Sequence, residues 1–190
     1  MRVASRGLSV SRHTLSWMNS DDDRYATAWH EAGHVMACQL RGVRVTHLRV
    51  DTDYGRVGFE NGSGVAYAFI AYAGPWAEAR AKWTEPTIDD DTLDAAGRSF
   101  TDRVASAFRS NTSDWANYEQ EMGGDVSVAD AGLSEMFGWD FVWPPMTLPD
   151  PAWDAELEAR WPEIQEMAAR MLAGEQVIAF GSNEPLLRQP

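Results

Sequence analysis

Apolar and polar residues recur along the chain with a spacing that predicts mainly helical structure. The acids at 21–23 suit the first turn of a helix over 24–41, and Gly42 is typical of a helix C-terminus. Gly74 and Pro75 lie inside a very apolar stretch and predict a break or kink there. We therefore expect helices at 24–41, 65–83, 102–122, 126–137 and 154–172.

A short hairpin is predicted between the first two helices. The valine-rich segment 43–50 suits a strand, the turn residues at 53–55 follow it, and 56–60 returns as a second strand. Val43 and Val45 are out of phase with Leu48 and Val50, which predicts a bulge or a strand buried on both faces. The fold class expected is α+β, mainly helical, with a small sheet beside the first helix.

The chain length of 190 residues suits one domain with a substantial core. We expect residues 21–190 to form that domain, closed by the helix at 154–172. Residues 1–20 contain arginine and serine but no acid, and they are expected to be a flexible N-terminal extension, with a transit peptide as the alternative. The most apolar run, 65–73, is too short to cross a bilayer, so no membrane association is expected.

A formal net charge of −13 argues against nucleic acid as a partner, because this charge repels phosphate backbones. The acidity favours solubility, with an acidic docking surface for a basic substrate as the other interpretation. Cys38 is the single cysteine and excludes an intrachain disulfide, so a cytoplasmic location is expected. We interpret Cys38 as a buried structural thiol.

The segment His30-Glu31-Ala32-Gly33-His34 matches the pattern H-E-x-x-H. Residues four apart share one face of a helix, so both imidazoles can reach one ion. A catalytic zinc takes three protein ligands and keeps one position for a water molecule, whose pKa it lowers to about 7. A neighbouring carboxylate can accept the proton of that water and return it to the leaving amine, which is the role predicted for Glu31.

The alternative for this motif is a pair of solvated helix histidines beside a surface glutamate. Gly33 argues against that alternative, because a glycine inside a helix costs about 1 kcal/mol relative to alanine. We therefore expect another backbone or helix to approach closely at Gly33.

The wider segment 26–34, A-T-A-W-H-E-A-G-H, resembles the T-A-x-H-E-A-G-H motif of the FtsH-type ATP-dependent zinc proteases. A second segment, 73–78, is similar to the A-G-x-x-A-E helix of that family, which packs beside the metal helix. The resemblance spans about residues 25–82. It implies a zincin-like metallopeptidase fold with zinc as the cofactor.

The resemblance also implies that the third zinc ligand is an aspartate on a later helix, preceded by small polar residues. Asp114 and Asp125 both fit that description. Asp114 is favoured because it belongs to a predicted helical stretch and comes first after the core helix, although a helix-capping aspartate is the competing interpretation. His13 and His47 complete the set of candidates, and neither has helical spacing to the motif.

The sequence departs from the FtsH-type pattern in three ways. It has no G-x-x-x-x-G-K-[ST] phosphate loop and no apolar run of membrane-spanning length, and the stretch from Glu78 to either aspartate is long for that family. We therefore expect a free-standing peptidase, without the ATPase, that acts on exposed or unfolded protein segments.

The function predicted is that of a zinc-dependent metallopeptidase that hydrolyses peptide bonds with a metal-activated water. The ligands expected are His30, His34 and Asp114, Glu31 is the general base, and the substrate is a peptide or protein. One of the strands at 43–50 and 56–60 could bind that substrate in extended form. The alternatives are a non-catalytic zinc-binding regulatory or interaction module and a protease that cleaves one specific partner. Substrate specificity and oligomeric state stay open.

Overall fold

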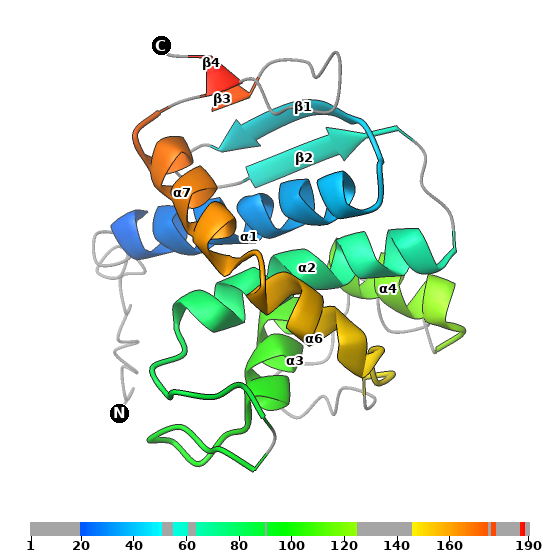
Figure 1. Cartoon of the computed structure of the whole chain (residues 1–190), viewed down its shortest axis with the longest axis vertical. Coiled ribbons are helices and arrows are strands. Elements are labelled where there is room, and N and C mark those ends of the chain that lie inside the picture. Colours follow the sequence, from blue (N-terminus) through cyan, green and yellow to red (C-terminus); the bar gives the residue numbers. More distant parts are fainter. Residues whose placement is uncertain are drawn as a thin grey trace, which may run out of the picture.

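The computed structural model describes residues 20–50, 55–60, 64–89, 91–124, 146–174, 176–177 and 187–188. This part of the chain is mainly helical, with a small antiparallel sheet, which agrees with the α+β class (Figure 1). The predicted helix at 126–137 lies outside the described residues, and the division into an extension and one domain stays a prediction. The elements are α1 (Ser20–Leu40), β1 (Val45–Val50), β2 (Gly55–Phe59), α2 (Val65–Ala81), α3 (Phe100–Ser110), α4 (Thr112–Met122), α6 (Pro151–Glu158), α7 (Trp161–Leu172), β3 (Gln176–Val177) and β4 (Leu187–Arg188).

Helix α1 begins four residues before the predicted start, so the acids at 21–23 lie in its first turns. This placement suits the positive end of the helix dipole. Gly42 follows the C-terminus with a φ of 65°, a conformation that glycine adopts without strain. The hydrophobic residues of α1 between Ala28 and Cys38 are buried.

Strands β1 and β2 form the predicted hairpin. Their register shifts between Val45 and His47, so the predicted irregularity is a bulge in β1. Val45 and Leu48 are both buried in spite of their phase, because the bulge turns them to the same face of the hairpin. That face lies over α1 (Figure 1).

A break or kink was predicted at Gly74 and Pro75; helix α2 is continuous through both residues, so the break does not occur. Proline inside a helix costs about 3 kcal/mol, but every residue from Ala68 to Ala77 is buried, and this packing outweighs the local penalty. The predicted close approach at Gly33 is confirmed. A Cβ atom at Gly33 would collide with the backbone carbonyl of Ala73, so α1 and α2 cross with their backbones in contact.

Two predicted helices are each divided in the structure. The stretch 102–122 is interrupted at Asn111, whose N–H bonds to the carbonyl of Phe108 at the end of α3. The stretch 154–172 is interrupted between α6 and α7, where Pro162 lies in the first turn of α7. Proline lacks a backbone donor and disfavours helical backbone in the residue before it, so a new helix begins there.

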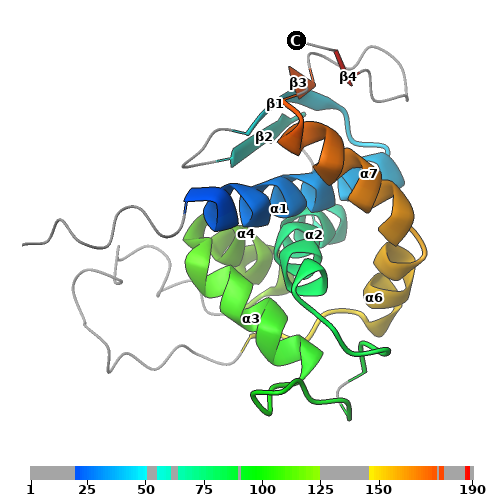
Figure 2. The same ribbon diagram turned by 90° about the vertical axis from the view of Figure 1, so that its left-hand side faces the viewer.

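The helices surround α1 and α2 in layers. The hairpin covers one side of α1, and α2 covers the opposite side. Helices α3 and α4 lie on one flank of this pair, and α6 and α7 lie on the other (Figures 1 and 2).

Two arginines connect the flank formed by α6 and α7 to the central helices. Arg41 binds both carboxylate oxygens of Glu156 and lies over the ring of Phe69, and Arg80 binds both oxygens of Glu158.

Aromatic side chains fill the centre of these layers. Trp161 stacks on Trp29 with ring centroids 4.9 Å apart and meets the edge of Trp76 at 5.9 Å, so one ring joins α7 to both central helices.

Within the described ranges, no helix combines the length and the apolar character needed to cross a membrane.

Candidate metal centre

The H-E-x-x-H motif lies in the middle of α1, on the side that faces α2. His30 and His34 are buried, and their ring centroids are 4.7 Å apart. Their Nε2 atoms are separated by 3.0 Å. The four-residue spacing therefore directs both imidazoles to the same point between the helices.

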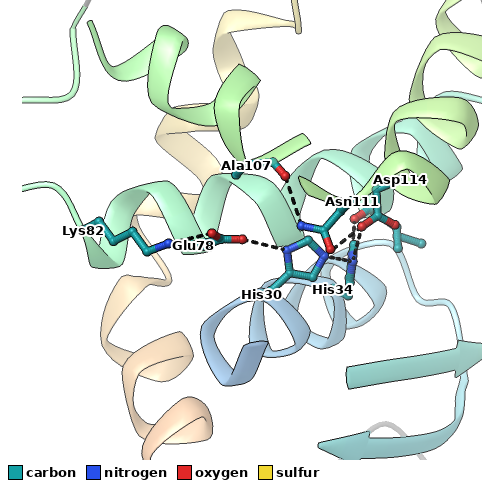
Figure 3. A network of polar contacts seen from close by, with 8 residues as sticks. His30, His34, Glu78, Lys82, Ala107, Asn111 and Asp114 are labelled. Carbon is teal, nitrogen blue, oxygen red and sulfur yellow. Dashed lines mark hydrogen bonds and ion pairs between the residues drawn. The ribbon is translucent and has the colours of Figure 1, made fainter. Parts of the chain in front are cut away.

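Asp114 completes this group from the first turn of α4. Its Oδ2 atom lies 2.8 Å from Nε2 of His30 and 3.4 Å from Nε2 of His34 (Figure 3). The ligand atoms of the three residues all lie within 4.8 Å of one another. In the part of the chain that the structure describes, no other group of three or more His, Cys, Asp or Glu side chains converges in this way.

The donor set suits a cation. The Nδ1–H of His34 donates to the carbonyl of Ile70 at 2.7 Å, so the Nε2 atom presents its lone pair to the group. Two imidazole nitrogens only 3.0 Å apart repel each other unless a proton or a metal ion lies between them or beside them. Two imidazoles with one carboxylate form a recognised set of zinc ligands.

The electrostatics favour positive charge at the same point. Burial alone would lower the pKa of His30, but the hydrogen bond to Asp114, the contact with Glu78 and the charges of Asp114 and Glu31 raise it to about 10. Burial opposes ionisation of Asp114, yet the two imidazoles hold the pKa of its carboxyl well below the ordinary value. The carboxylates thus stabilise a cation between the imidazoles.

A second carboxylate lies behind His30. Oε2 of Glu78 on α2 is 3.5 Å from Nδ1 of His30, and Lys82 donates to Oε1 of Glu78 at 2.7 Å (Figure 3). Burial alone would raise the pKa of Glu78, but its contacts with His30 and Lys82 lower it. Such a carboxylate orients the imidazole so that Nε2 faces the metal position. Glu78 belongs to the segment 73–78 that was noted for its family resemblance, but no role was predicted for its side chain.

Glu31 is buried beside this group and is not one of its three donors. Its Oε2 atom has no hydrogen-bond partner among the described residues, and the backbone N–H of Val57 donates to its carboxyl group. Burial raises the pKa of Glu31, against the lowering effect of the two imidazoles. Glu31 is therefore a carboxylate with a free oxygen and a raised proton affinity, as a general base requires.

Two glycines leave room for these side chains. A Cβ atom at Gly74 would lie 2.5 Å from the ring of His34 and 2.8 Å from Nε2 of His30. A Cβ atom at Gly55 would collide with the side chains of Glu31 and Thr27. Both positions therefore need glycine so that α2 and β2 can lie close to the histidines and the glutamate.

Two cavities meet at this group. One, of about 390 Å³, contains all four motif and donor residues and has an apolar wall that includes Val57, Phe59 and Tyr67. The other, of about 760 Å³, lies toward the N-terminus of α1 and is lined by Asp23, Thr27 and Glu78 among others. The buried donor group is thus accessible from a cleft that continues on both sides of it.

The remaining candidate ligands do not join the group in the described structure. His47 lies on the outer face of the hairpin, where its ring covers Gly58. His13 and Asp125 lie outside the described residues. Burial raises the pKa of Cys38 to about 12, which fits the structural thiol that the sequence predicted.

Comparison with known proteins gives one family match. The family model described as Peptidase M50B-like matches residues 23–79, which include most of α1, the hairpin and most of α2 but not Asp114. None of the curated proteins and none of the solved structures matches the chain. The match covers less than a third of the sequence and does not single out the FtsH type. It supports a relationship to a metallopeptidase family and a protease-related function.

Proposed function

We propose that this chain is a zinc-dependent metallopeptidase with a zincin-like site, in which His30, His34 and Asp114 hold the metal. The observation that carries the proposal is the convergence of Nε2, Nε2 and Oδ2 of these residues within 4.8 Å, beside a buried carboxylate that is not a ligand. The FtsH-type resemblance of the segments 26–34 and 73–78 belongs to the same proposal. The family match to residues 23–79 supports the relationship to a metallopeptidase family.

Glu31 performs the proton transfer in this proposal. When bound, zinc supplies a Lewis acid that polarises a carbonyl group and lowers the pKa of a water molecule to about 7. Oε2 of Glu31, which has no partner among the described residues, accepts a proton as the water attacks the scissile carbonyl carbon. The same oxygen then delivers that proton to the leaving amine nitrogen as the C–N bond breaks.

The substrate proposed is an extended segment of a peptide or protein. One edge of β2 pairs with β1; several residues of β2 line the smaller cavity beside Glu31, and Gly55 lines the larger one as well. A peptide laid along the other edge of β2 would gain backbone hydrogen bonds and pass from one cavity to the other. Of the two predicted strands, β2 is the better candidate for this role because it lies closest to Glu31.

The geometry favours an enzyme over a zinc-binding scaffold. A structural zinc site is closed by four protein ligands and has no need of a further carboxylate. Here three donors converge, Glu31 lies beside them without joining them, and a cleft gives access to the group. The scaffold is retained as the alternative that the following experiment tests.

The test separates metal binding from turnover. Protein prepared without chelators should contain about one zinc per chain by elemental analysis, because the three donors complete a catalytic ligand set. Glu31→Gln should keep the zinc and lose peptide hydrolysis, while Glu60→Gln, at an exposed glutamate after β2, should keep both. A chain that binds no zinc would overturn the proposal, and a zinc-loaded wild type that cleaves no peptide in a broad library would favour the scaffold.

A second pair of variants tests the third ligand. Asp114→Ala should weaken zinc binding strongly, because its Oδ2 contacts both imidazoles. Asp125→Ala should leave zinc binding nearly unchanged. Titration of each apo variant with zinc against a chelating dye gives the two affinities, and the reverse order would assign the ligand to Asp125.

A further inference from the structure

Four residues line both cavities of the cleft: His30, Glu31, Gly55 and Asn111. Three of them belong to α1 and β2, whereas Asn111 comes from the junction of α3 and α4 (Figure 3). They mark the place where the two cavities meet. A substrate that extends from one cavity into the other must therefore pass beside Glu31 and Asn111.

The side chain of Asn111 does not cap α4, although Asn111 is the N-cap residue of that helix. It precedes α4 as the N-cap residue, where an asparagine oxygen ordinarily accepts a backbone N–H of the first turn. No such hydrogen bond is present in α4, whose first turn is held by the backbone carbonyl of Asn111 through the N–H groups of Asp114 and Trp115. The side-chain oxygen is thus not used for capping.

The orientation of the Asn111 amide is fixed from the other side. Nδ2 donates to the carbonyl of Ala107 in the last turn of α3, at 3.0 Å (Figure 3). This bond assigns the nitrogen to α3 and leaves Oδ1 without a hydrogen-bond partner among the described residues. An aspartate could not donate to Ala107, and it would add a further negative charge beside Asp114.

We propose that Asn111 is a further catalytic residue, whose Oδ1 atom accepts a hydrogen bond from the N–H of the scissile peptide bond. The inference rests on the proposed function. During hydrolysis the carbonyl carbon gains the oxygen of water, the C–N bond breaks, and the nitrogen gains the proton that Glu31 carries. An acceptor on Asn111, which lines the same junction as Glu31, would hold the N–H hydrogen, so the developing nitrogen lone pair stays free for the proton that Glu31 delivers.

A matched pair of substrates tests this role. One is a fluorogenic peptide that the wild type cleaves, and the other is the same sequence with an ester oxygen in place of the scissile N–H. The ester cannot donate the proposed hydrogen bond. We expect Asn111→Ala to lower the ratio of kcat/KM for peptide to kcat/KM for ester by about tenfold, the value of one good hydrogen bond. Asn117→Ala, which changes a residue that lines only the smaller cavity, should leave the ratio unchanged.

The ratio distinguishes positioning from folding. Both substrates are measured on the same preparation, so a loss of folded protein or of zinc cancels between them, and zinc analysis and circular dichroism record those losses separately. Equal losses on peptide and ester would make Asn111 a structural residue and overturn this inference alone. A wild type that hydrolyses neither substrate would overturn the proposed function and this inference with it.

Discussion

Replacing Gly74 by alanine should damage the metal centre more than the fold. The added Cβ would lie 2.5 Å from Cε1 and Nε2 of His34 and 2.8 Å from Nε2 of His30. Ordinary contacts between such atoms are about 3.5 Å, so the rings must retreat by about 0.7 to 1 Å. Ligand positions in a metal site tolerate only about 0.2 Å.

The two free energies change by different amounts. Alanine gains about 1 kcal/mol over glycine inside a helix, which offsets much of the roughly 1–3 kcal/mol that overpacking costs. The free energy of unfolding of the metal-free Gly74→Ala protein should therefore change little. Zinc binding must move the two imidazole rings back against the added methyl group, so the overpacking energy opposes binding in full. We expect zinc affinity to fall by roughly 5- to 150-fold.

The matched control is Gly33→Ala, at the other glycine of this helix crossing. Its Cβ would collide with the backbone of Ala73, which cannot rotate away as a side chain can. Gly33→Ala should therefore lose more unfolding free energy than Gly74→Ala and less zinc affinity. Urea unfolding of the apo proteins and zinc titration against a chelating dye measure both quantities. Wild-type zinc affinity in Gly74→Ala would refute the reasoning.

Two further predictions concern carboxylates outside the donor set. Glu78→Gln should lower zinc affinity by about 10- to 100-fold without loss of helix content, because Glu78 orients His30; dye competition measures this, and an unchanged affinity would contradict it. The pKa of Asp94 is lowered to about 2, first by the backbone N–H of Arg98 and also by the Arg103 side chain. The ionised carboxylate therefore stabilises the fold above its unfolded pKa, and that stability is lost as pH falls from about 4 to 2. In Asp94→Asn, the midpoint urea concentration of unfolding should depend less on pH between about 4 and 2 than it does in the wild type. An unchanged pH dependence would contradict this role of Asp94.

The sequence predicted best those features that depend on residues close together in the chain. The four-residue spacing of His30 and His34 needs only a helix, and the cost of Gly33 inside that helix pointed correctly to a close backbone contact. The phase change in the first strand likewise indicated either a bulge or burial on both faces, and the structure has the bulge. Each of these inferences follows from local geometry alone.

Features that depend on packing between distant segments were not predictable in the same way. The continuity of α2 through Pro75 reflects burial on all sides, which no local pattern reveals. Asparagine is common at a helix N-cap and proline in the first turn of a helix. Asn111 and Pro162 could therefore have indicated that the two long predicted helices are each divided. The choice of Asp114 from the sequence rested on family resemblance, and its proximity to the histidines became visible only from the placement of α4.

The sequence positions of the three candidate ligands indicate the order in which their helices dock during folding. His30 and His34 come from one helix, which pairs with α2 soon after in the sequence, whereas Asp114 lies 84 residues beyond His30. Closing this longer loop costs under about 1 kcal/mol more than closing the loop between α1 and α2, a difference that favours docking of α4 after α1 has paired with α2. The complete donor set then exists only in molecules whose long-range contacts are made. Metal uptake would therefore act as a late checkpoint of folding, since the ion adds its binding free energy to the last contact formed.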